Sequence, residues 1–312
     1  MIQGSVVRSD YERTFHTEYH FGLLLTAWTI CYINPKSKKM SSPIARTILA
    51  FQTNAKLYNL CTAITSITPF SSLAEANRLL FKSATEDDSV VTTKETIFHP
   101  QGGGQPSDVG EMTSSSGAKL AVSMVRMDAL NDGQVLHLGR FESPEKVFSV
   151  GETATQSIDV EKRLLYSRLH TAGHVLGSAV RHLLEDKIEG FDELKASHFP
   201  DSAACEFQGL IEGKWKGDIQ EKLDSFIKAA MPVEIDFWDE EEFRKNGLER
   251  LIPSEEGVKL APGEKYRVVR IVGAEVYPCG GTHVDTTDQC GKVGVKKISR
   301  NKGTSRVSYN VS

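Results

Sequence analysis

Two histidines four positions apart, His170 and His174, lie in a segment with helical periodicity. Residues at this spacing share one face of a helix, with their Cβ atoms about 5–6 Å apart. Two imidazoles placed in this way can reach a single Zn²⁺ ion at about 2.0–2.1 Å. The pair by itself does not distinguish a metal site from two ordinary surface or core histidines.

A second pair of metal-type ligands, Cys279 and His283, follows Pro278 and encloses Gly280 and Gly281. Proline and glycine at these positions predict a loop and not a helix. Such a loop can return a thiolate and an imidazole to a common point. With the two earlier histidines, the chain offers four N and S donors, the set that tetrahedral Zn²⁺ prefers. The alternative is a turn with a buried cysteine and a solvated histidine.

The residue after the first histidine is Thr171. Metalloproteases with the HExxH motif carry a glutamate there as the general base, so the sequence disfavours that class. A bound zinc would either be structural or, with one position open, lower the pKa of a water toward about 7. Four protein ligands would close the site, and spacing leaves both roles open. No side chain is identified as a general base.

The elements that must position these ligands change in character near residue 155. Before it, strands are predicted at Ser89–Phe98, Leu120–Met127 and Gln134–Leu138, with a hairpin turn at Asn131–Gly133 between the last two. Alternation on either side of Thr53-Asn54 predicts another hairpin turn. Short strands joined by turns indicate a small all-β unit, which can close as a barrel.

The second part of the chain mixes helices with strands. An amphipathic helix is predicted to begin at Asp159 and to end before Gly190, with apolar residues at spacings of four and three. Further predicted elements are a helix over 216–230 ended by Pro232, a strand over 233–237, a short helix over 240–251 ended by Pro253, and strands over 267–272 and 293–298. This pattern predicts an α+β fold.

Composition excludes several classes of protein. The 312 residues are 39% hydrophobic and 25% charged, which excludes a mainly disordered or fibrous chain. Lys and Arg number 37 and Asp and Glu 41, so the net charge of −4 excludes a general polyanion binder. Nucleic-acid contact would need a local basic patch, and one stretch without acidic residues supplies it: Lys292, Lys296, Lys297, Arg300, Lys302 and Arg306. The alternative is a strand edge protected by lysines.

Cysteine usage and apolar runs bear on the compartment. Five scattered cysteines form a poor disulfide framework and favour a reducing compartment, so a cytoplasmic location is expected. No apolar run reaches the ~18–20 residues of a transmembrane helix, and no membrane partner is expected. Residues 1–39 differ from the rest and are an unplaced extension. Either translation begins at Met40, or residues 1–39 are real and a mitochondrial location is open.

Three ordered motifs resemble those of a known family. They are Phe98–Gly110 with its run of three glycines, His170–His174, and Cys279–Val284, and the segments 197–199 and 306–309 are similar as well. Over roughly residues 45–312 the chain resembles the alanyl-tRNA editing proteins of AlaX type in their medium form. It is also similar to the editing (second additional) domain of alanyl- and threonyl-tRNA synthetases.

The resemblance implies a β-barrel-like domain with a Gly-rich loop over 40–155 and an α+β editing domain over 156–312. It implies one Zn²⁺ ion per chain, held by His170, His174, Cys279 and His283. The implied reaction is hydrolysis of tRNA(Ala) mischarged with serine or glycine by a zinc-assisted water, and no ATP is expected. The sequence leaves two alternatives: a zinc-stabilised RNA-binding protein without catalysis, and a zinc hydrolase of small esters.

Substrate contacts are predicted from the same motifs. The backbone of Gly102, Gly103 and Gly104 is expected to approach the substrate, the alternative being a plain tight turn. Gln105 and Thr171 are the expected partners of a serine hydroxyl, since a site built around that hydrogen bond penalises its absence. Residues expected to contact tRNA phosphates are Lys296, Lys297, Arg300, Lys302 and Arg306. His198 and Cys205 are candidates to line the site, and buried structural roles are favoured for both.

Overall fold

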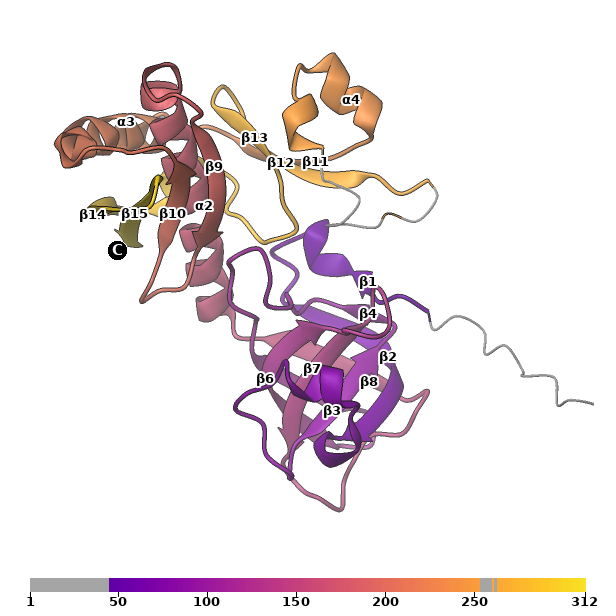
Figure 1. The fold of residues 1–312 in the computed structure, drawn as a ribbon. Coiled ribbons are helices and arrows are strands. Elements are labelled where there is room, and N and C mark those ends of the chain that lie inside the picture. Colours follow the sequence, from indigo (N-terminus) through magenta and orange to yellow (C-terminus); the bar gives the residue numbers. More distant parts are fainter. Residues whose placement is uncertain (1–44, 253–259, 261–262) are drawn as a thin grey trace, which may run out of the picture. The chain divides into compact units, whose positions relative to one another are not determined.

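A closed six-stranded antiparallel barrel forms the first part of the chain (Figure 1). The computed structural model describes residues 45–252, 260 and 263–312, so the predictions for 1–39, Met40 and Pro253 lie outside the described residues. The barrel strands are β2 (Asn59–Pro69), β3 (Ser89–Thr93), β7 (Val135–Phe141), β6 (Lys119–Met127), β5 (Gly110–Ser114) and β8 (Thr153–Ile158), in that spatial order. The predicted barrel is therefore confirmed.

Alternation along the strands fills the barrel. On β8, burial alternates residue by residue, which places Ala154, Gln156 and Ile158 on the inner face. The apolar interior includes Ile64, Val91, Met112, Leu120, Val125 and Val135. The predicted turn at 131–133 joins β6 to β7, where Gly133 adopts a φ of +71°. That left-handed conformation suits glycine, which explains the turn signal in the sequence.

The predicted hairpin turn at Thr53-Asn54 is wrong. Before it, β1 (Ile48–Leu49) pairs in parallel with β4 (Glu95–Thr96), and residues Ala50–Gln52 form a short 3₁₀ helix, η1. After it, β2 pairs with β3 and β8 instead. Ala50 and Phe51 are both buried, so burial does not alternate there. Two alternating residues on each side of a turn were too few to specify a partner strand.

The second part of the chain is α+β, as predicted. The long helix α2 (Val160–Leu184) begins at Asp159, whose side chain accepts a hydrogen bond from the Lys162 N–H. Its apolar face packs against α3 (Lys216–Lys228) and against one face of a four-stranded sheet. That sheet has the order β14 (Val293–Asn301), β15 (Thr304–Val311), β10 (Ala204–Gln208), β9 (Asp192–Ser197).

A second sheet of three strands carries the cysteine loop. Its order is β11 (Val233–Trp238), β12 (Tyr266–Ile271), β13 (Glu275–Pro278). The short helix α1 (Glu75–Arg78) belongs to the barrel part, and α4 (Glu240–Lys245) follows β11. The single helix predicted over 240–251 is wrong, because Gly247 at φ +68° separates α4 from the 3₁₀ turn Glu249–Leu251.

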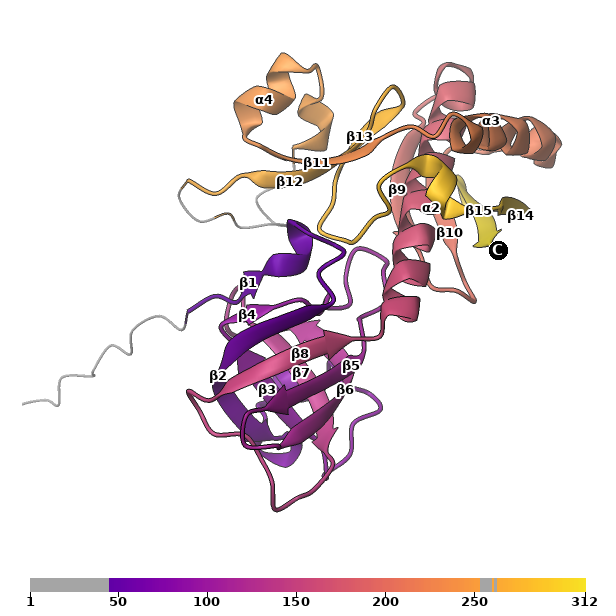
Figure 2. The ribbon, with the colours of Figure 1, turned by 180° about the vertical axis from the view of Figure 1, so that it is seen from behind.

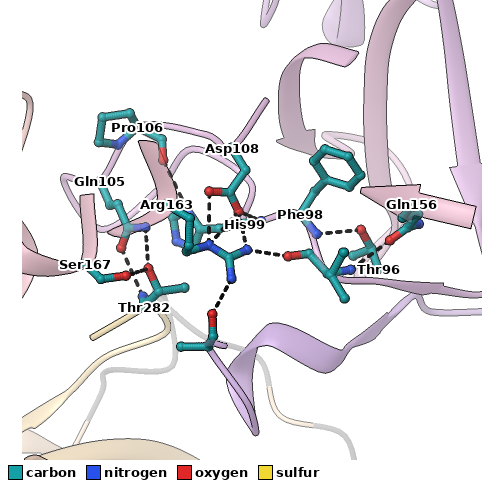
Figure 3. A network of polar contacts seen from close by, with 12 residues as sticks. Thr96, Phe98, His99, Gln105, Pro106, Asp108, Gln156, Arg163, Ser167 and Thr282 are labelled. Carbon is teal, nitrogen blue, oxygen red and sulfur yellow. Dashed lines mark hydrogen bonds and ion pairs between the residues drawn. The ribbon is translucent and has the colours of Figure 1, made fainter. Parts of the chain in front are cut away.

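One buried ion pair joins the barrel to α2. Strand β8 leads directly into the helix (Figure 2), and Arg163 in its first turn binds the Asp108 carboxylate. Asp108 also accepts a hydrogen bond of 2.6 Å from the His99 N–H, and Arg163 donates to the Ala55 carbonyl oxygen at 2.7 Å (Figure 3). The glycine-rich loop is thereby fixed to the helix. Because β8 spans the predicted domain boundary at residue 155, that boundary stays a prediction.

Within the described part of the chain, no helix combines the length and apolar character that crossing a membrane requires.

Candidate metal centre

The four predicted ligands converge, although the two pairs are more than a hundred residues apart. His170 and His174 extend from α2, and Cys279 and His283 lie on the loop after β13. One donor atom from each lies within 4.8 Å of the others. Cys279 Sγ is 3.4 Å from Nε2 of both His170 and His283. Tetrahedral ligands 2.0–2.3 Å from one ion lie roughly 3.3–3.8 Å apart, so the cluster can hold a metal ion.

Gln105, from the glycine-rich loop, fixes the ring of His170. Its side-chain Oε1 accepts hydrogen bonds from the Thr282 N–H at 3.0 Å and from His170 Nδ1 at 2.7 Å (Figure 3 shows the contact to Thr282). Since an amide oxygen only accepts, the proton of His170 sits on Nδ1. The lone pair on Nε2 then faces Cys279. Protein metal sites use this arrangement to orient a ligand and raise its basicity.

Thr171 has the same relation to His283. Its Oγ1 accepts from the Val284 N–H at 3.2 Å and lies 3.1 Å from His283 Nδ1, and a hydroxyl oxygen can accept both of these hydrogen bonds. With the proton of His283 on Nδ1, the lone pair of its Nε2 is directed at Cys279. His174 Nδ1, by contrast, is buried without a hydrogen-bond partner among the described residues. A buried polar atom of this kind is the position that a bound ion would satisfy.

Burial keeps these imidazoles neutral. It lowers the pKa of His170 and of His283 well below the ordinary value of 6.5, and lowers the pKa of His174 to about 3. The neutral ring is the form that binds a metal. Burial also raises the pKa of the Cys279 thiol, and the Gly281 N–H and the Arg267 guanidinium act in the opposite direction. A bound cation would deprotonate the thiol outright.

A cavity of about 400 Å³, here called the metal cavity, opens beside His170, His174 and Cys279. It is also lined by Gly103, Arg181, Glu193, His198, Cys205 and Tyr277. Both His198 and Cys205 are buried, as predicted, but both also contribute to the wall of this cavity. The donor cluster therefore has an accessible side on which a substrate can bind.

His198 is oriented as firmly as the metal-type histidines. Its ring stacks on His170 with a centroid separation of 4.2 Å. The Tyr309 hydroxyl donates to the Leu169 carbonyl oxygen at 2.9 Å, and so accepts from His198 Nδ1 at 2.7 Å. The proton of His198 is thus held on Nδ1. Its Nε2, which has no hydrogen-bond partner among the described residues, is left as an acceptor at the cavity wall.

The glycine-rich loop forms a tight turn and also approaches another backbone closely. Gly102 and Gln105 exchange backbone hydrogen bonds, and Gly104 adopts a φ of +76°. The Gly104 carbonyl oxygen accepts from the His198 N–H at 2.8 Å, and a Cβ on Gly104 would overlap the Ala196 carbonyl oxygen. Gly103 lines the metal cavity. Contact of this loop with substrate stays a prediction.

Gln105 and Thr171 lie behind the metal-type ligands, where both are fully buried. Neither contributes to the wall of the metal cavity. Their polar atoms are engaged with His170, Thr282 and His283. Selection of a serine hydroxyl by these two residues therefore stays a prediction, and the structure gives each of them a contact to a histidine ring.

The predicted tRNA contacts lie on the hairpin of β14 and β15. Lys296, Lys297, Arg300 and Lys302 are exposed there. Arg306 is partly engaged, because it pairs with Glu206 at 3.0 Å and donates to the Ser202 carbonyl oxygen at 2.9 Å. The hairpin can therefore present to a polyanion four exposed cationic side chains that form no ion pair within the described part of the chain, and their contact with tRNA stays a prediction.

Sequence reasoning missed a polar cluster at the far end of the metal cavity. Arg181, buried on α2, pairs with Glu193 at 2.9 Å and with Glu275 at 3.4 Å. The Tyr277 hydroxyl donates to the His174 carbonyl oxygen at 3.2 Å, and burial raises the pKa of Glu193. An arginine seven residues after His174, on the buried side of a helix, was the signal available. Its partner lies on β9, a strand without apolar alternation.

Comparisons with known proteins agree on one family. The sequence profile described as "Threonyl and Alanyl tRNA synthetase second additional domain" matches residues 266–308. The chain is 30% identical over 221 residues to alanyl-tRNA editing protein AlaX-M of Methanosarcina barkeri, covering 70% of this chain and 86% of that protein. It is 27% identical over 231 residues to AlaX-L of Pyrococcus horikoshii, covering 72% and 52%.

A longer relative matches as well. The chain is 31% identical over 239 residues to the alanine–tRNA ligase of Methanosphaera stadtmanae, covering 72% of this chain and 24% of the ligase. The chain thus spans about a quarter of the length of that ligase and about half of AlaX-L.

Proposed function

Because the chain belongs to the alanyl-tRNA editing proteins of the AlaX family, we propose that it hydrolyses tRNA(Ala) mischarged with serine or glycine. The observation that carries this proposal is the convergence of three imidazoles and one thiol beside an accessible cavity. The medium form, as in AlaX-M, is the one proposed, with a single Zn²⁺ ion per chain. No ATP is required, because the aminoacyl ester is already activated.

Zn²⁺ fits the donor set. Three imidazole nitrogens and one thiolate favour a borderline-soft ion with tetrahedral geometry. His170 and His283 each keep an oriented Nε2 lone pair, and His174 keeps an unpartnered Nδ1. A bound Zn²⁺ ion would supply Lewis-acid polarisation of an ester carbonyl or a water if that group binds in addition to the four donors or in place of one of them, and would otherwise be structural. Cytoplasmic location is proposed as well, supported by the free cysteines Cys61, Cys205, Cys279 and Cys290.

The chain's own side chains bind and orient the reactants. In the reaction, the oxygen of a water bonds to the ester carbonyl carbon and the bond from that carbon to the ribose oxygen breaks. The ribose oxygen gains a proton, which leaves free amino acid and uncharged tRNA. His198 Nε2 accepts a hydrogen bond from that water, and the fixed proton on Nδ1 keeps the ring in the accepting form. A water held in position lowers the barrier, because less translational and rotational entropy is lost on reaching the transition state.

The other end of the metal cavity suits the amino group of the substrate. Glu193 lines it and supplies a carboxylate toward a substrate ammonium. The tRNA body is placed against the hairpin of β14 and β15, where Lys296, Lys297, Arg300 and Lys302 meet phosphates and Arg306 contributes from its pair with Glu206.

The test is ester loss from Ser-, Gly- and Ala-tRNA(Ala) incubated with the purified protein. We expect loss from one or both of the mischarged species, with Ala-tRNA(Ala) preserved. His174→Ala removes a donor and is expected to abolish the reaction. His182→Ala is the matched control, because His182 lies on the same helix, is exposed, and contacts the Ala274 carbonyl oxygen and the edge of the Phe226 ring, away from the donor cluster.

Two results would contradict the proposal. Zinc and tRNA binding without ester loss would indicate a non-catalytic RNA-binding protein. Hydrolysis of small esters with mischarged tRNA left intact would indicate a hydrolase for which tRNA is irrelevant.

A further inference from the structure

A second, larger cavity of about 670 Å³ lies on the other side of the cysteine loop. It shares Pro278, Cys279 and Gly280 with the metal cavity, so these residues form a ridge between the two. We call it the Phe237 cavity; its other lining residues include Arg46, Ile48, Met127, Phe237, Lys265 and Arg267. Its volume is within the range of sites that hold small molecules and nucleotides.

Three of the large apolar side chains that line this cavity are exposed. Ile48 on β1 is 53% exposed, Met127 on β6 38% and Phe237 on β11 39%. They come from three separate segments of the chain, so their grouping is a product of the fold. Contiguous exposed apolar side chains mark binding surfaces, and an aromatic ring among them offers a stacking face for a nucleobase.

Cationic side chains outnumber acidic ones among the described residues that line the Phe237 cavity, although Arg46 and Lys265 are also paired with Asp132 and Asp239 nearby. Three cationic residues and one acidic residue line it within the described chain. The acid, Glu264, binds Arg46 at 2.8 Å, and Lys265 binds Glu242 at 2.8 Å. Arg267 is 7% exposed, has no acidic partner among the described residues, and leaves Nη2 without a hydrogen bond. The Cys279 sulfur is the group that acts on Arg267 with negative charge when it is ionised, and a second anion nearby would offset more of the cost of burying this cation.

The metal cavity has a different balance of cationic and acidic side chains. Among the described residues, those with charged side chains that line it are three cations and three acids: Arg181, Lys195, Arg250, Asp192, Glu193 and Glu206. A zwitterionic or ammonium-bearing group suits that cavity, and a phosphate suits the Phe237 cavity. One ligand that carries an aminoacyl group at one end and phosphates next to it matches both.

The ridge between the cavities permits such a ligand to cross. Gly280 is exposed and has no side chain, and the ridge is held by Arg267, which donates to the Cys279 carbonyl oxygen. Gln52 donates to the Gly280 carbonyl oxygen at 3.5 Å. We propose that the nucleotide before the aminoacylated terminal adenosine binds in the Phe237 cavity, with its base against Phe237 and its phosphate toward Arg267. The inference rests on the proposed function, because it places the ester in the metal cavity.

The experiment compares a long and a minimal ligand. Binding of a fluorescent single-stranded RNA ending in CCA is measured by anisotropy, and hydrolysis is measured with Ser-tRNA(Ala) and with 3′-O-seryl-adenosine. We expect Phe237→Ala to weaken RNA binding and to lower kcat/KM on Ser-tRNA(Ala) by about tenfold, the loss typical of one stacked base. Hydrolysis of seryl-adenosine, which lacks the preceding nucleotide, is expected to stay within about twofold.

Two variants serve as controls. Phe237→Trp keeps a stacking face and is expected to retain RNA binding. Val272→Ala shortens an apolar side chain of similar exposure, 37%, just beyond β12 in the same sheet, and is expected to change nothing.

Three outcomes would overturn the inference. They are no RNA binding by the wild type, unchanged binding in Phe237→Ala, and an equal loss on seryl-adenosine. RNA binding that depends on Phe237 without any ester hydrolysis would contradict the proposed function and leave the cavity assignment intact.

Discussion

Two regions of this protein bury histidines, and they use them differently. In the barrel, His137 donates from Nδ1 to the Val91 carbonyl oxygen at 2.9 Å and accepts at Nε2 from Thr96 Oγ1 at 2.8 Å. At the donor cluster, His170 and His283 use only Nδ1 within the protein and direct Nε2 at Cys279. Burial lowers the pKa in both regions, to about 4 for His137.

The difference teaches which observation identifies a metal site. A buried histidine with a lowered pKa occurs in both regions, so neither property distinguishes them. The position of the second ring nitrogen does: in His137 it is engaged by Thr96, whereas in His170 it faces the sulfur of Cys279 within a cluster of donor atoms. Convergence of several such nitrogens with a thiol, and not burial, therefore identifies the site; His170 has its other nitrogen fixed by Gln105, and His174 has no ring hydrogen bond among the described residues.

The largest expected effect comes from removing one histidine of each kind. His170→Ala should reduce bound zinc from one ion per chain to almost none and slow deacylation on the order of a thousandfold, since metal polarisation contributes several kcal/mol. His137→Ala should keep the zinc and lose about 2–4 kcal/mol of unfolding free energy, because it removes a buried ring and its hydrogen bonds. Elemental analysis and urea unfolding measure both. Full zinc content in His170→Ala would contradict the comparison.

Next in size is the ion pair that connects the regions. Arg163→Met should lower the unfolding free energy by about 3–5 kcal/mol, because it leaves the buried carboxylate of Asp108 without its partner. The matched control, Arg244→Met, breaks an exposed pair with Glu240 and should cost no more than about 0.5 kcal/mol. The measurement is the urea midpoint at constant slope. Equal losses of unfolding free energy in the two variants would contradict the prediction, because an unpaired Asp108 would then cost no more than an unpaired Glu240.

Substitution of Gln105 tests whether its contact with His170 contributes to zinc binding at the donor cluster. Gln105→Ala should weaken zinc binding by about 10- to 100-fold, because the ring of His170 loses the acceptor that fixes its proton. Gln105→Glu keeps an acceptor at this position and should retain most of the affinity. Competition with a zinc chelator gives the values. An affinity unchanged in Gln105→Ala would mean that the cluster orients His170 without the barrel loop.

The pH dependence of stability should report the histidine of the barrel. The pKa of His137 is about 4 in the folded protein and about 6.5 when exposed, so the unfolded chain takes up a proton first as pH falls. Its contribution is complete above pH 6.5 and is lost by about 1.4 kcal/mol per unit as pH falls toward 4. In His137→Gln the unfolding free energy should therefore fall less steeply between pH 6.5 and pH 4, by about 1.4 kcal/mol per pH unit. Parallel curves for the two proteins would contradict it.

The smallest effect concerns the basic hairpin. The double charge reversal of Lys296 and Lys297 to Glu should weaken tRNA binding by about tenfold at low salt and reduce the dependence of affinity on salt. Arg306→Gln is the comparison, and should act less because Arg306 is already paired with Glu206. Filter binding over a salt series measures both. Unchanged binding in the double variant would remove the hairpin from the interface.

Several predictions from the sequence were confirmed because local interactions decide them. Helix periodicity and a capping Asp159 predicted α2, and the four-residue spacing placed His170 and His174 on one face. Glycine at 133 marked the turn between β6 and β7. The third helix was wrong because Gly247 interrupts it, and the hairpin at 53–54 was wrong because its strands pair elsewhere.

The sequence by itself determined the donor types, their two spacings and the helix and loop that carry them, because such features depend on neighbours within a few residues. The tertiary structure alone decided that Gln105 meets His170, that Arg181 meets Glu193, and that Ile48, Met127 and Phe237 share a cavity. Those contacts join residues with no periodic or local relation to one another. Packing of distant elements creates them, and one-dimensional patterns carry no record of it.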